Sequence, residues 1–199
     1  TLDYDTTKIF LGKLPTPDYG KYVKYFRKGE YVYMLVKPSV MYYDMAFSPD
    51  GKYLMAGDRA GSYVWNIETG AKTCYLKEDN ITPQCVAYSP DGKYIATGGI
   101  PLYSVRDKSE KKSSLTIWNN ASKSKERILQ GHTAPVDFLR FCQNGKYLAS
   151  ASEDGTIRIW DYDKGIEKAS IILVDERDYV VTTPAGYYMS SRGGVAGVG

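Results

Sequence analysis

The side chains best suited to chemistry are few in this sequence: one histidine, His132, and three cysteines, Cys74, Cys85 and Cys142. A serine or cysteine nucleophile needs a neighbouring base, usually an imidazole, so any such dyad would have to use His132. The absence of a C-x-x-C pair and the single histidine both argue against a Cys/His zinc site. The sequence also lacks the G-x-x-x-x-G-K-[ST] loop that cradles phosphates. We therefore expect no metal and no cofactor.

Composition limits the function further. The 199 residues are 43% hydrophobic and 25% charged, which is ordinary for a globular domain. A net charge of +3 is too balanced to predict nucleic-acid binding. No apolar run approaches the roughly 20 residues of a membrane helix, so no membrane span is expected. No leader opens the sequence, which favours the cytoplasm, but Thr1 is not an initiator residue, and a removed signal would place the protein in the periplasm.

The elements that must position these side chains are repeated. The segment 45–54 recurs as 86–95 and, more loosely, as 139–148. The turn glycines Gly51 and Gly92 are 92 − 51 = 41 residues apart, and Gly145 follows Gly92 by 145 − 92 = 53. A period of about 40–45 residues is that of propeller blades, and the longer spacing indicates an insertion of about a dozen residues.

Each repeat predicts four strands. In the third, alternating or β-rich segments at 136–141, 147–152, 156–160 and 168–173 are separated by Asn-Gly, Asp-Gly and Lys-Gly turns. Four short antiparallel strands make one blade. Because no segment has a sustained helical period, the sequence predicts an all-β fold.

The third repeat carries Gly131-His132, Ser150, Asp154-Gly155 and Trp160-Asp161 at the spacing of a WD-repeat signature. The chain therefore resembles the WD-repeat (WD40) β-propeller family. The resemblance implies a hydrogen-bonded network within this blade, formed by His132, Ser150 or Ser152, Asp154 and Trp160. His132 would then have a structural role, which leaves no base for catalysis. The first two repeats lack Gly-His, and we expect them to depend on packing more than on such a network.

The predicted units are 1–38 (partial blade), 39–79, 80–130 with an insertion at 100–114, 131–173, and 174–199 (the first strands of a further blade). Three full blades do not close a ring, so the resemblance implies part of a larger propeller of about seven blades. Segment 178–191 also resembles the segment that follows WD repeats in bacterial (Bacteroidetes-type) multidomain proteins, some of which carry a caspase-like domain.

Partners of WD-repeat proteins usually dock on the face built by the turns between the second and third strands and by the loops that enter the first strand. Repeat alignment places five candidates there: Tyr43, Arg59, Gln84, Asp137 and Glu153. The insertion should project from the same face with four basic residues, Arg106, Lys108, Lys111 and Lys112. A loop on a rigid scaffold is a common place for binding, although a solvated Lys- and Ser-rich loop needs no function. An acidic protein surface is the first expected partner, and a phosphate-bearing ligand is the second.

The leading hypothesis is a non-enzymatic scaffold for protein–protein interactions. The alternative is the regulatory or sensory propeller of a larger bacterial enzyme, such as a caspase-like peptidase whose catalytic domain would lie outside this chain. A hydrolytic or lyase propeller ranks third, because the expected histidines and metal ligands are missing from the sequence.

Overall fold

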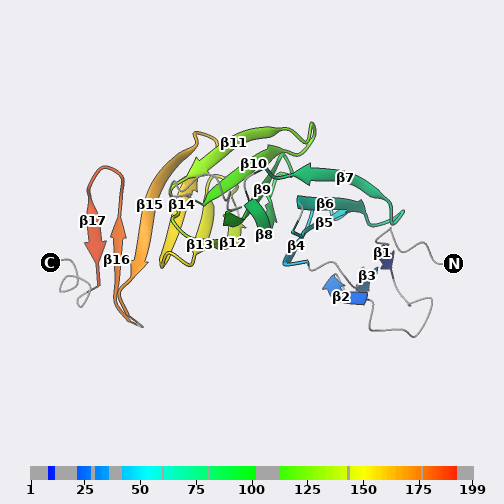
Figure 1. Ribbon diagram of the computed structural model, residues 1–199, viewed down its shortest axis with the longest axis horizontal. Coiled ribbons are helices and arrows are strands. Elements are labelled where there is room, and N and C mark those ends of the chain that lie inside the picture. Colours follow the sequence, from blue (N-terminus) through cyan, green and yellow to red (C-terminus); the bar gives the residue numbers. More distant parts are fainter. Residues whose placement is uncertain are drawn as a thin grey trace, which may run out of the picture.

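A computed structural model describes residues 42–59, 61–79, 81–101, 113–142, 144–175 and 177–191, together with the backbone of three strands before residue 36. All the regular elements among these residues are strands, which confirms the all-β prediction (Figure 1). No helix long and apolar enough to cross a membrane occurs in the described part of the chain.

The strands form one small sheet and three larger ones. The small sheet has the order β1-β3-β2 and lies before the first complete repeat. Sheet one has the order β4-β5-β6-β7, sheet two β8-β9-β10-β11, and sheet three β12-β13-β14-β15-β16-β17. All pairings are antiparallel. The bounds are β1 Ile9–Leu11, β2 Tyr22–Arg27, β3 Glu30–Leu35, β4 Asp44–Phe47, β5 Tyr53–Gly57, β6 Gly61–Asn66, β7 Lys72–Lys77, β8 Ile81–Tyr88, β9 Tyr94–Pro101, β10 Ser114–Asn119, β11 Lys125–Gln130, β12 Val136–Phe141, β13 Leu148–Ser152, β14 Thr156–Asp161, β15 Ile166–Leu173, β16 Tyr179–Thr182 and β17 Tyr188–Ser190.

The same turn joins the first two strands of each repeat. Gly51 and Gly92 both have φ 72° and Gly145 has φ 64°, a left-handed conformation that favours glycine. In the first repeat, Ser48 Oγ accepts a hydrogen bond from Tyr53 N–H at 2.9 Å and donates one to the Asp50 carboxylate at 2.6 Å. The Ser-Pro-Asp-Gly sequence thus closes the first two hairpins locally, since Ser89 Oγ accepts from Tyr94 N–H in the same way. In the third repeat Cys142 replaces the serine, and its Sγ accepts from Tyr147 N–H at 3.0 Å.

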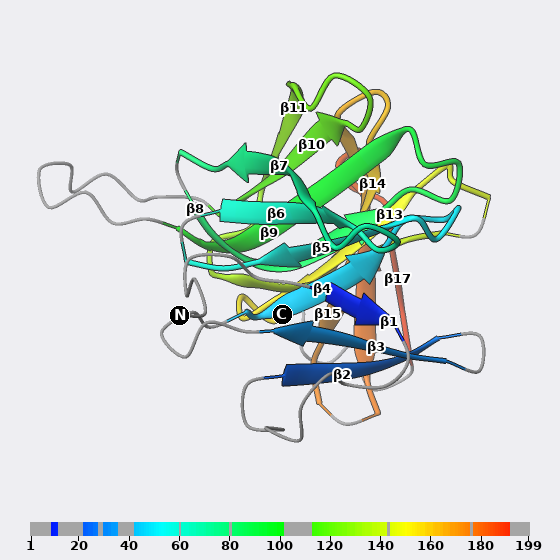
Figure 2. The same ribbon diagram turned by 90° about the vertical axis from the view of Figure 1, so that its right-hand side faces the viewer.

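The three larger sheets pack face to face along the chain (Figure 2). Their inner strands β4, β8 and β12 are neighbours (Figure 1). Met55, Val64 and Leu76 of sheet one share a buried cluster with Val86, Ile95 and Trp118 of sheet two. Leu115 and Ile117 of sheet two share another with Leu148 and Trp160 of sheet three. These repeated interfaces are the stacked blades that the sequence period predicts.

The last two strands differ from the expected arrangement. The sequence assigns residues 174–199 to a further blade, and strands do form at β16 and β17. In the structure, however, β16 pairs with β15, so the hairpin extends sheet three to six strands. The outer edge of β15 offers unpaired N–H and C=O groups, which an adjacent hairpin can satisfy. The period of the sequence predicts the hairpin, but not the strand with which it pairs.

Candidate functional site

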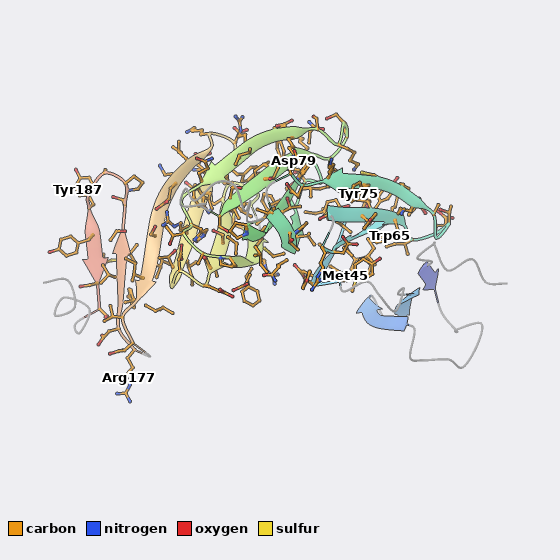
Figure 3. All side chains as sticks on the ribbon, viewed as in Figure 1. Met45, Trp65, Tyr75, Asp79, Arg177 and Tyr187 are labelled. Atoms are coloured by element: carbon orange, nitrogen blue, oxygen red, sulfur yellow. The ribbon has the colours of Figure 1, made fainter. Side chains whose placement is uncertain are left out.

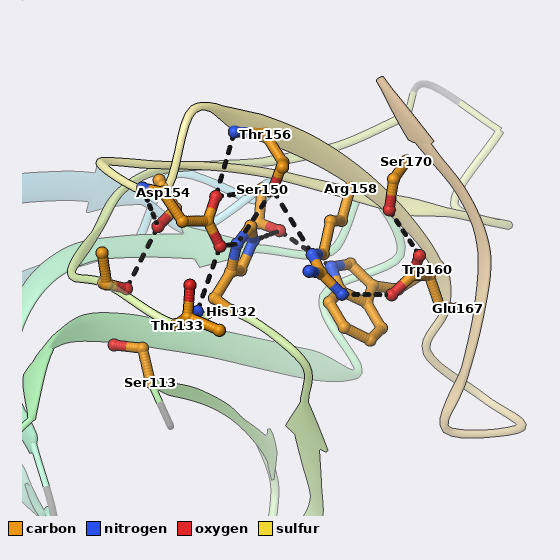
Figure 4. Close-up of polar contacts among 12 residues, drawn as sticks. Ser113, His132, Thr133, Ser150, Asp154, Thr156, Arg158, Trp160, Glu167 and Ser170 are labelled. Carbon is orange, nitrogen blue, oxygen red and sulfur yellow. Dashed lines mark hydrogen bonds and ion pairs between the residues drawn. The ribbon is translucent and has the colours of Figure 1, made fainter. Parts of the chain in front are cut away.

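The structure brings together Ser150 of β13, Trp160 of β14, His132 of the connection before β12 and Asp154 of the β13–β14 turn (Figure 4). Trp160 Nε1–H donates to Ser150 Oγ at 2.8 Å, and Ser150 Oγ lies 2.7 Å from His132 Nε2. His132 Nδ1 lies 2.8 Å from Asp154 Oδ2. One proton arrangement satisfies all four groups: indole N–H to hydroxyl, hydroxyl to Nε2, and Nδ1–H to the carboxylate. We call this set the histidine network.

Burial and hydrogen bonding fix the charges of this network. Burial lowers the pKa of His132 below its ordinary value, although the hydrogen bond and the charge of Asp154 oppose this effect. Burial alone would raise the pKa of Asp154, but hydrogen bonds from Thr156 and His132 outweigh it and lower that pKa to about 2. A neutral imidazole next to an ionised carboxylate follows. His132 is only 1% exposed, so both ring nitrogens are engaged and turned away from solvent.

Ser152, the other hydroxyl considered from the sequence, lies outside this relay. Its Oγ donates to the Ala134 carbonyl at 3.1 Å and accepts from Asp154 N–H at 3.1 Å. Ser152 therefore shapes the turn that carries Asp154, whereas Ser150 contacts the imidazole. Sequence spacing alone left the choice between the two open.

Sheet two has a network of its own, which the sequence analysis missed. Trp118 Nε1–H donates to Thr97 Oγ1 at 2.9 Å, and the Thr97 hydroxyl donates to the Glu78 carboxylate. Thr116 Oγ1 donates to the same carboxylate at 3.2 Å, and Lys125 Nζ lies 4.0 Å from it. We call this set the glutamate network. The expectation that the second repeat depends mainly on packing was wrong. The Glu78 carboxylate accepts a hydrogen bond from the Thr97 hydroxyl, as the His132 imidazole accepts one from the Ser150 hydroxyl in the third repeat.

The environment of Glu78 differs from that of His132. Burial raises the pKa of Glu78, whereas hydrogen bonds from Thr97 and the charge of Lys125 act in the opposite direction. A partial sequence signal existed: Thr97 and Ser150 both stand five residues after their turn glycines, Gly92 and Gly145. Nothing in the sequence marks Glu78 itself as buried, since a glutamate is usually exposed.

Sheet one lacks the hydroxyl of these networks. Ala56 occupies the position of Thr97 and Ser150, five residues after Gly51. Trp65 is 1% exposed, and its Nε1 has no hydrogen-bond partner among the described residues. Its ring instead packs on Tyr42, with centroids 6.0 Å apart in an edge contact, and on Tyr63 at 5.7 Å. The first repeat thus depends on packing, as its sequence predicts.

Tyr43, Gln84 and Asp137 each stand eight residues before a turn glycine. Tyr43 directly precedes β4, Gln84 lies within β8, and Asp137 is the second residue of β12. Gln84 stands at a register irregularity between Pro83 and Cys85, and Asp137 stands at one between Val136 and Phe138. Such β-bulges take a residue out of the ladder and redirect its side chain.

Arg59 and Glu153, the two candidates in turns, contact the segments that carry Tyr43 and Asp137. Arg59 Nε donates to the Tyr43 hydroxyl at 3.5 Å, and Glu153 N–H donates to the Pro135 carbonyl at 3.0 Å. Arg59 and Glu153 are exposed, whereas Tyr43, Gln84 and Asp137 are partly buried. We call these five residues the bulge face.

The four basic residues of the predicted insertion cannot be placed in the structure. Arg106, Lys108, Lys111 and Lys112 lie outside the described residues, which end at Pro101 on one side of the insertion and resume at Ser113 on the other. In the part of the chain that the structure describes, no three His, Cys, Asp or Glu side chains gather as metal ligands.

Comparisons with known proteins agree with this geometry. The family model described as "WD domain, G-beta repeat" matches residues 76–108 and 123–161. Apoptotic protease-activating factor 1 of Danio rerio is 26% identical over 132 residues, which cover 66% of this chain and 10% of that protein. WD repeat-containing protein 18 of Danio rerio is 24% identical over 157 residues, or 73% of this chain and 34% of that protein. Pre-mRNA-processing factor 19 homolog 2 of Arabidopsis thaliana is 35% identical over 77 residues, or 39% of this chain and 14% of that protein.

The chain spans between a tenth and a third of the length of these curated relatives. All three are eukaryotic, and the likeness of segment 178–191 to bacterial multidomain proteins stays a prediction. The repeated strands, the recurrent tryptophans and the matches at 76–108 and 123–161 together show that this chain carries WD40 repeats.

Proposed function

We propose that the chain is a non-enzymatic scaffold for protein–protein interactions, and that a partner protein docks on the bulge face. WD40-repeat proteins are generally scaffolds of this kind, which supports the proposal. The observation that carries it is the pair of bulges at Gln84 and Asp137, which occur at one repeat position in two neighbouring blades. A bulge disrupts the ladder, and bulges are over-represented where a side chain is redirected toward a site.

The chemistry of the bulge face varies while the framework beneath it repeats. One position is Tyr43, Gln84 or Asp137, and the adjoining turn carries Arg59 in one blade and Glu153 in another. Because the insertion follows β9, its four basic residues would add positive charge at the same end of sheet two. This charge favours a partner with an acidic surface, and a phosphate-bearing ligand is the second choice.

The test compares two triple variants. The face variant carries Arg59→Ala, Asp137→Ala and Glu153→Ala. The control carries Arg127→Ala, Glu126→Ala and Asp163→Ala, which remove the same charges from exposed positions on β11 and on the turn after β14. Proteins cross-linked to the tagged chain in its native host are identified by mass spectrometry, and the purified hit is titrated against each variant.

We expect the face variant to raise Kd about tenfold or more, which is about 1.4 kcal/mol, and the control to change it less than about twofold. Neutralising Arg106, Lys108, Lys111 and Lys112 should also weaken binding and reduce its salt dependence, with an almost unchanged Tm. Equal losses in the face and control variants, or a hit that binds both as tightly as the wild type, would reject the bulge face as the docking site.

A further inference from the structure

The first hairpin turn of the third repeat carries an amide where the first two repeats carry a carboxylate. Its strands, β12 and β13, lie between sheet two and the β16–β17 hairpin (Figure 3). Asn144 stands directly before the turn glycine, where the earlier repeats have Asp50 and Asp91. Each aspartate accepts a hydrogen bond at 3.0 Å from the backbone N–H two residues later. Asn144 Oδ1 accepts from Lys146 N–H at 3.0 Å, so the amide occupies the place of a carboxylate.

Two hydrogen bonds converge on the side-chain oxygen of Asn144. Besides Lys146 N–H, the Cys142 thiol donates to Oδ1 at 2.7 Å, and this thiol is held in place because its Sγ accepts from Tyr147 N–H at 3.0 Å. Both donors draw electrons from Cγ and would stabilise a negative charge developing on Oδ1, as the donors of an oxyanion hole do. The NH2 group is at the other end of the amide, on an exposed side chain.

The backbone nitrogen of Gly145 is a nucleophile within the same turn. Its attack on Cγ of the preceding residue closes a small ring, so chain connectivity keeps the two atoms close. Gly145 has φ 64° and no side chain to obstruct the approach. Its N–H donates to the Cys142 carbonyl at 2.9 Å. That hydrogen bond lies in the plane of the peptide group and leaves the face of the nitrogen open for the attack.

No other asparagine of the sequence combines these features. Of the five asparagines, only Asn144 precedes a glycine. Asn66 Oδ1 also accepts from a backbone N–H, that of Thr69 at 2.9 Å. However, the branched side chain of Ile67 crowds the nitrogen that would have to attack. The other asparagines therefore serve as internal controls within one molecule.

We propose that Asn144 is a self-modification site, at which the turn deamidates through attack of the Gly145 nitrogen on Asn144 Cγ. As the new C–N bond forms, the proton of that nitrogen passes to the NH2 group, and ammonia leaves with the electron pair of the Cγ–Nδ2 bond. The remaining succinimide takes up water at a carbonyl carbon, one of its C–N bonds breaks, and Gly145 N regains a proton. In sum, an amide and a water give a carboxylate and an ammonium ion, with no change in oxidation state.

The fold favours one of the two products of this hydrolysis. Opening at Cγ gives aspartate, and the first two repeats show that an aspartate fits the turn. Opening at the backbone carbonyl gives isoaspartate, which adds one atom to the main chain. Hydrogen bonds from Gly145 N–H to the Cys142 carbonyl and from Cys142 N–H to the Tyr147 carbonyl, both at 2.9 Å, close the turn at its present length. We therefore expect more aspartate in the folded chain than in the denatured chain.

Deamidation also changes the environment of Cys142. In the first two repeats, Ser48 and Ser89 donate to the carboxylates of Asp50 and Asp91 at 2.6 Å and 2.7 Å. The thiol would donate to a carboxylate in the same way after deamidation, and a negative charge beside a thiol disfavours the thiolate. Because the thiolate is the reactive form, alkylation of Cys142 should slow as the amide is lost.

The test follows the purified chain at neutral pH in water enriched in heavy oxygen. Oxygen from water enters the carboxyl group that deamidation forms, so peptide mapping by mass spectrometry identifies the asparagine that has reacted. The informative pair of variants is Cys142→Ala, which removes a donor to Oδ1, and Cys142→Ser, which supplies the hydroxyl of the first two repeats. Both variants and the wild type are also followed in denaturant, where the turn is absent.

We expect heavy oxygen at position 144 and at none of the other four asparagines. In the folded state, Cys142→Ala should react several-fold more slowly than Cys142→Ser, and this difference should vanish in denaturant. An amide at Asn144 that persists in the folded chain while the denatured chain deamidates would overturn the proposal. Equal folded-state rates for the two variants would also overturn it, because the reaction would then follow from the Asn-Gly sequence alone and not from the turn.

Discussion

Trp65 and Trp160 occupy the same position in the first and third repeats, yet only one of their indole N–H groups is hydrogen-bonded. Trp160 donates to Ser150 within the histidine network, whereas Trp65 faces Ala56 and has no partner among the described residues. An unpartnered buried donor costs about 1–3 kcal/mol, and an aromatic pair contributes about 0.5–1.5 kcal/mol beyond its buried area. The two aromatic contacts of Trp65 can therefore offset most of the missing hydrogen bond. A blade can be stabilised by a polar relay or by aromatic packing.

The largest effect should come from Trp160→Ala. This change removes a large buried ring and leaves Ser150 and His132 with an incomplete network, so we expect a loss of about 3–5 kcal/mol in the free energy of unfolding. Chemical denaturation followed by circular dichroism measures it. A loss below about 1 kcal/mol would mean that the histidine network contributes little.

Replacing each tryptophan by phenylalanine distinguishes the stabilisation by the indole hydrogen bond from the stabilisation by packing of the ring. Trp160→Phe removes the donor to Ser150, whereas Trp65→Phe removes an N–H that has no described partner. The first change should cost about 1–2 kcal/mol more than the second, because the lost volume is the same in both. Equal losses in the two denaturation curves would show that the indole hydrogen bond has no net value here.

Much of this comparison could be predicted from the sequence, and part of it could not. The glycine turns, the strands and the set His132, Ser150, Asp154 and Trp160 follow from local spacing. Glu78 did not, because its burial depends on how sheet two closes around Thr97 and Lys125. The same limit applies to β16, since its pairing with the edge of β15 depends on contacts between elements rather than on the sequence period.

The smallest effect is a pair of opposite pH dependences. The pKa of Glu78 is raised in the fold. Its contribution to the free energy of unfolding is therefore complete below the unfolded pKa of about 4.5 and is lost as pH rises through the folded pKa. The pKa of His132 is lowered in the fold. Its contribution to the free energy of unfolding is therefore complete above the unfolded pKa of about 6.5 and is lost as pH falls through the folded pKa.

The measurement is the free energy of unfolding between pH 4 and pH 8 for Glu78→Gln and His132→Gln. Relative to the wild type, Glu78→Gln should become more favourable as pH rises, and the cost of His132→Gln should shrink as pH falls. Parallel pH profiles for the two variants would contradict the assignment of opposite charge behaviour to the two networks.

The turn shared by the first hairpins of the three repeats also bears on how quickly the chain can fold. Each turn is closed by groups within five residues of one another, such as Ser48 and Tyr53, so each hairpin can nucleate without distant contacts. Folding of a repeat array can then start at any unit and spread to its neighbours. The second unit is the exception, because residues 102–113 separate β9 from β10, whereas three residues separate the equivalent strands of the first and third units. A fourfold longer loop adds about 1.2 kcal/mol of closure entropy. The central blade should therefore assemble last, onto neighbours that are already formed, and its insertion sets the rate at which the array becomes continuous.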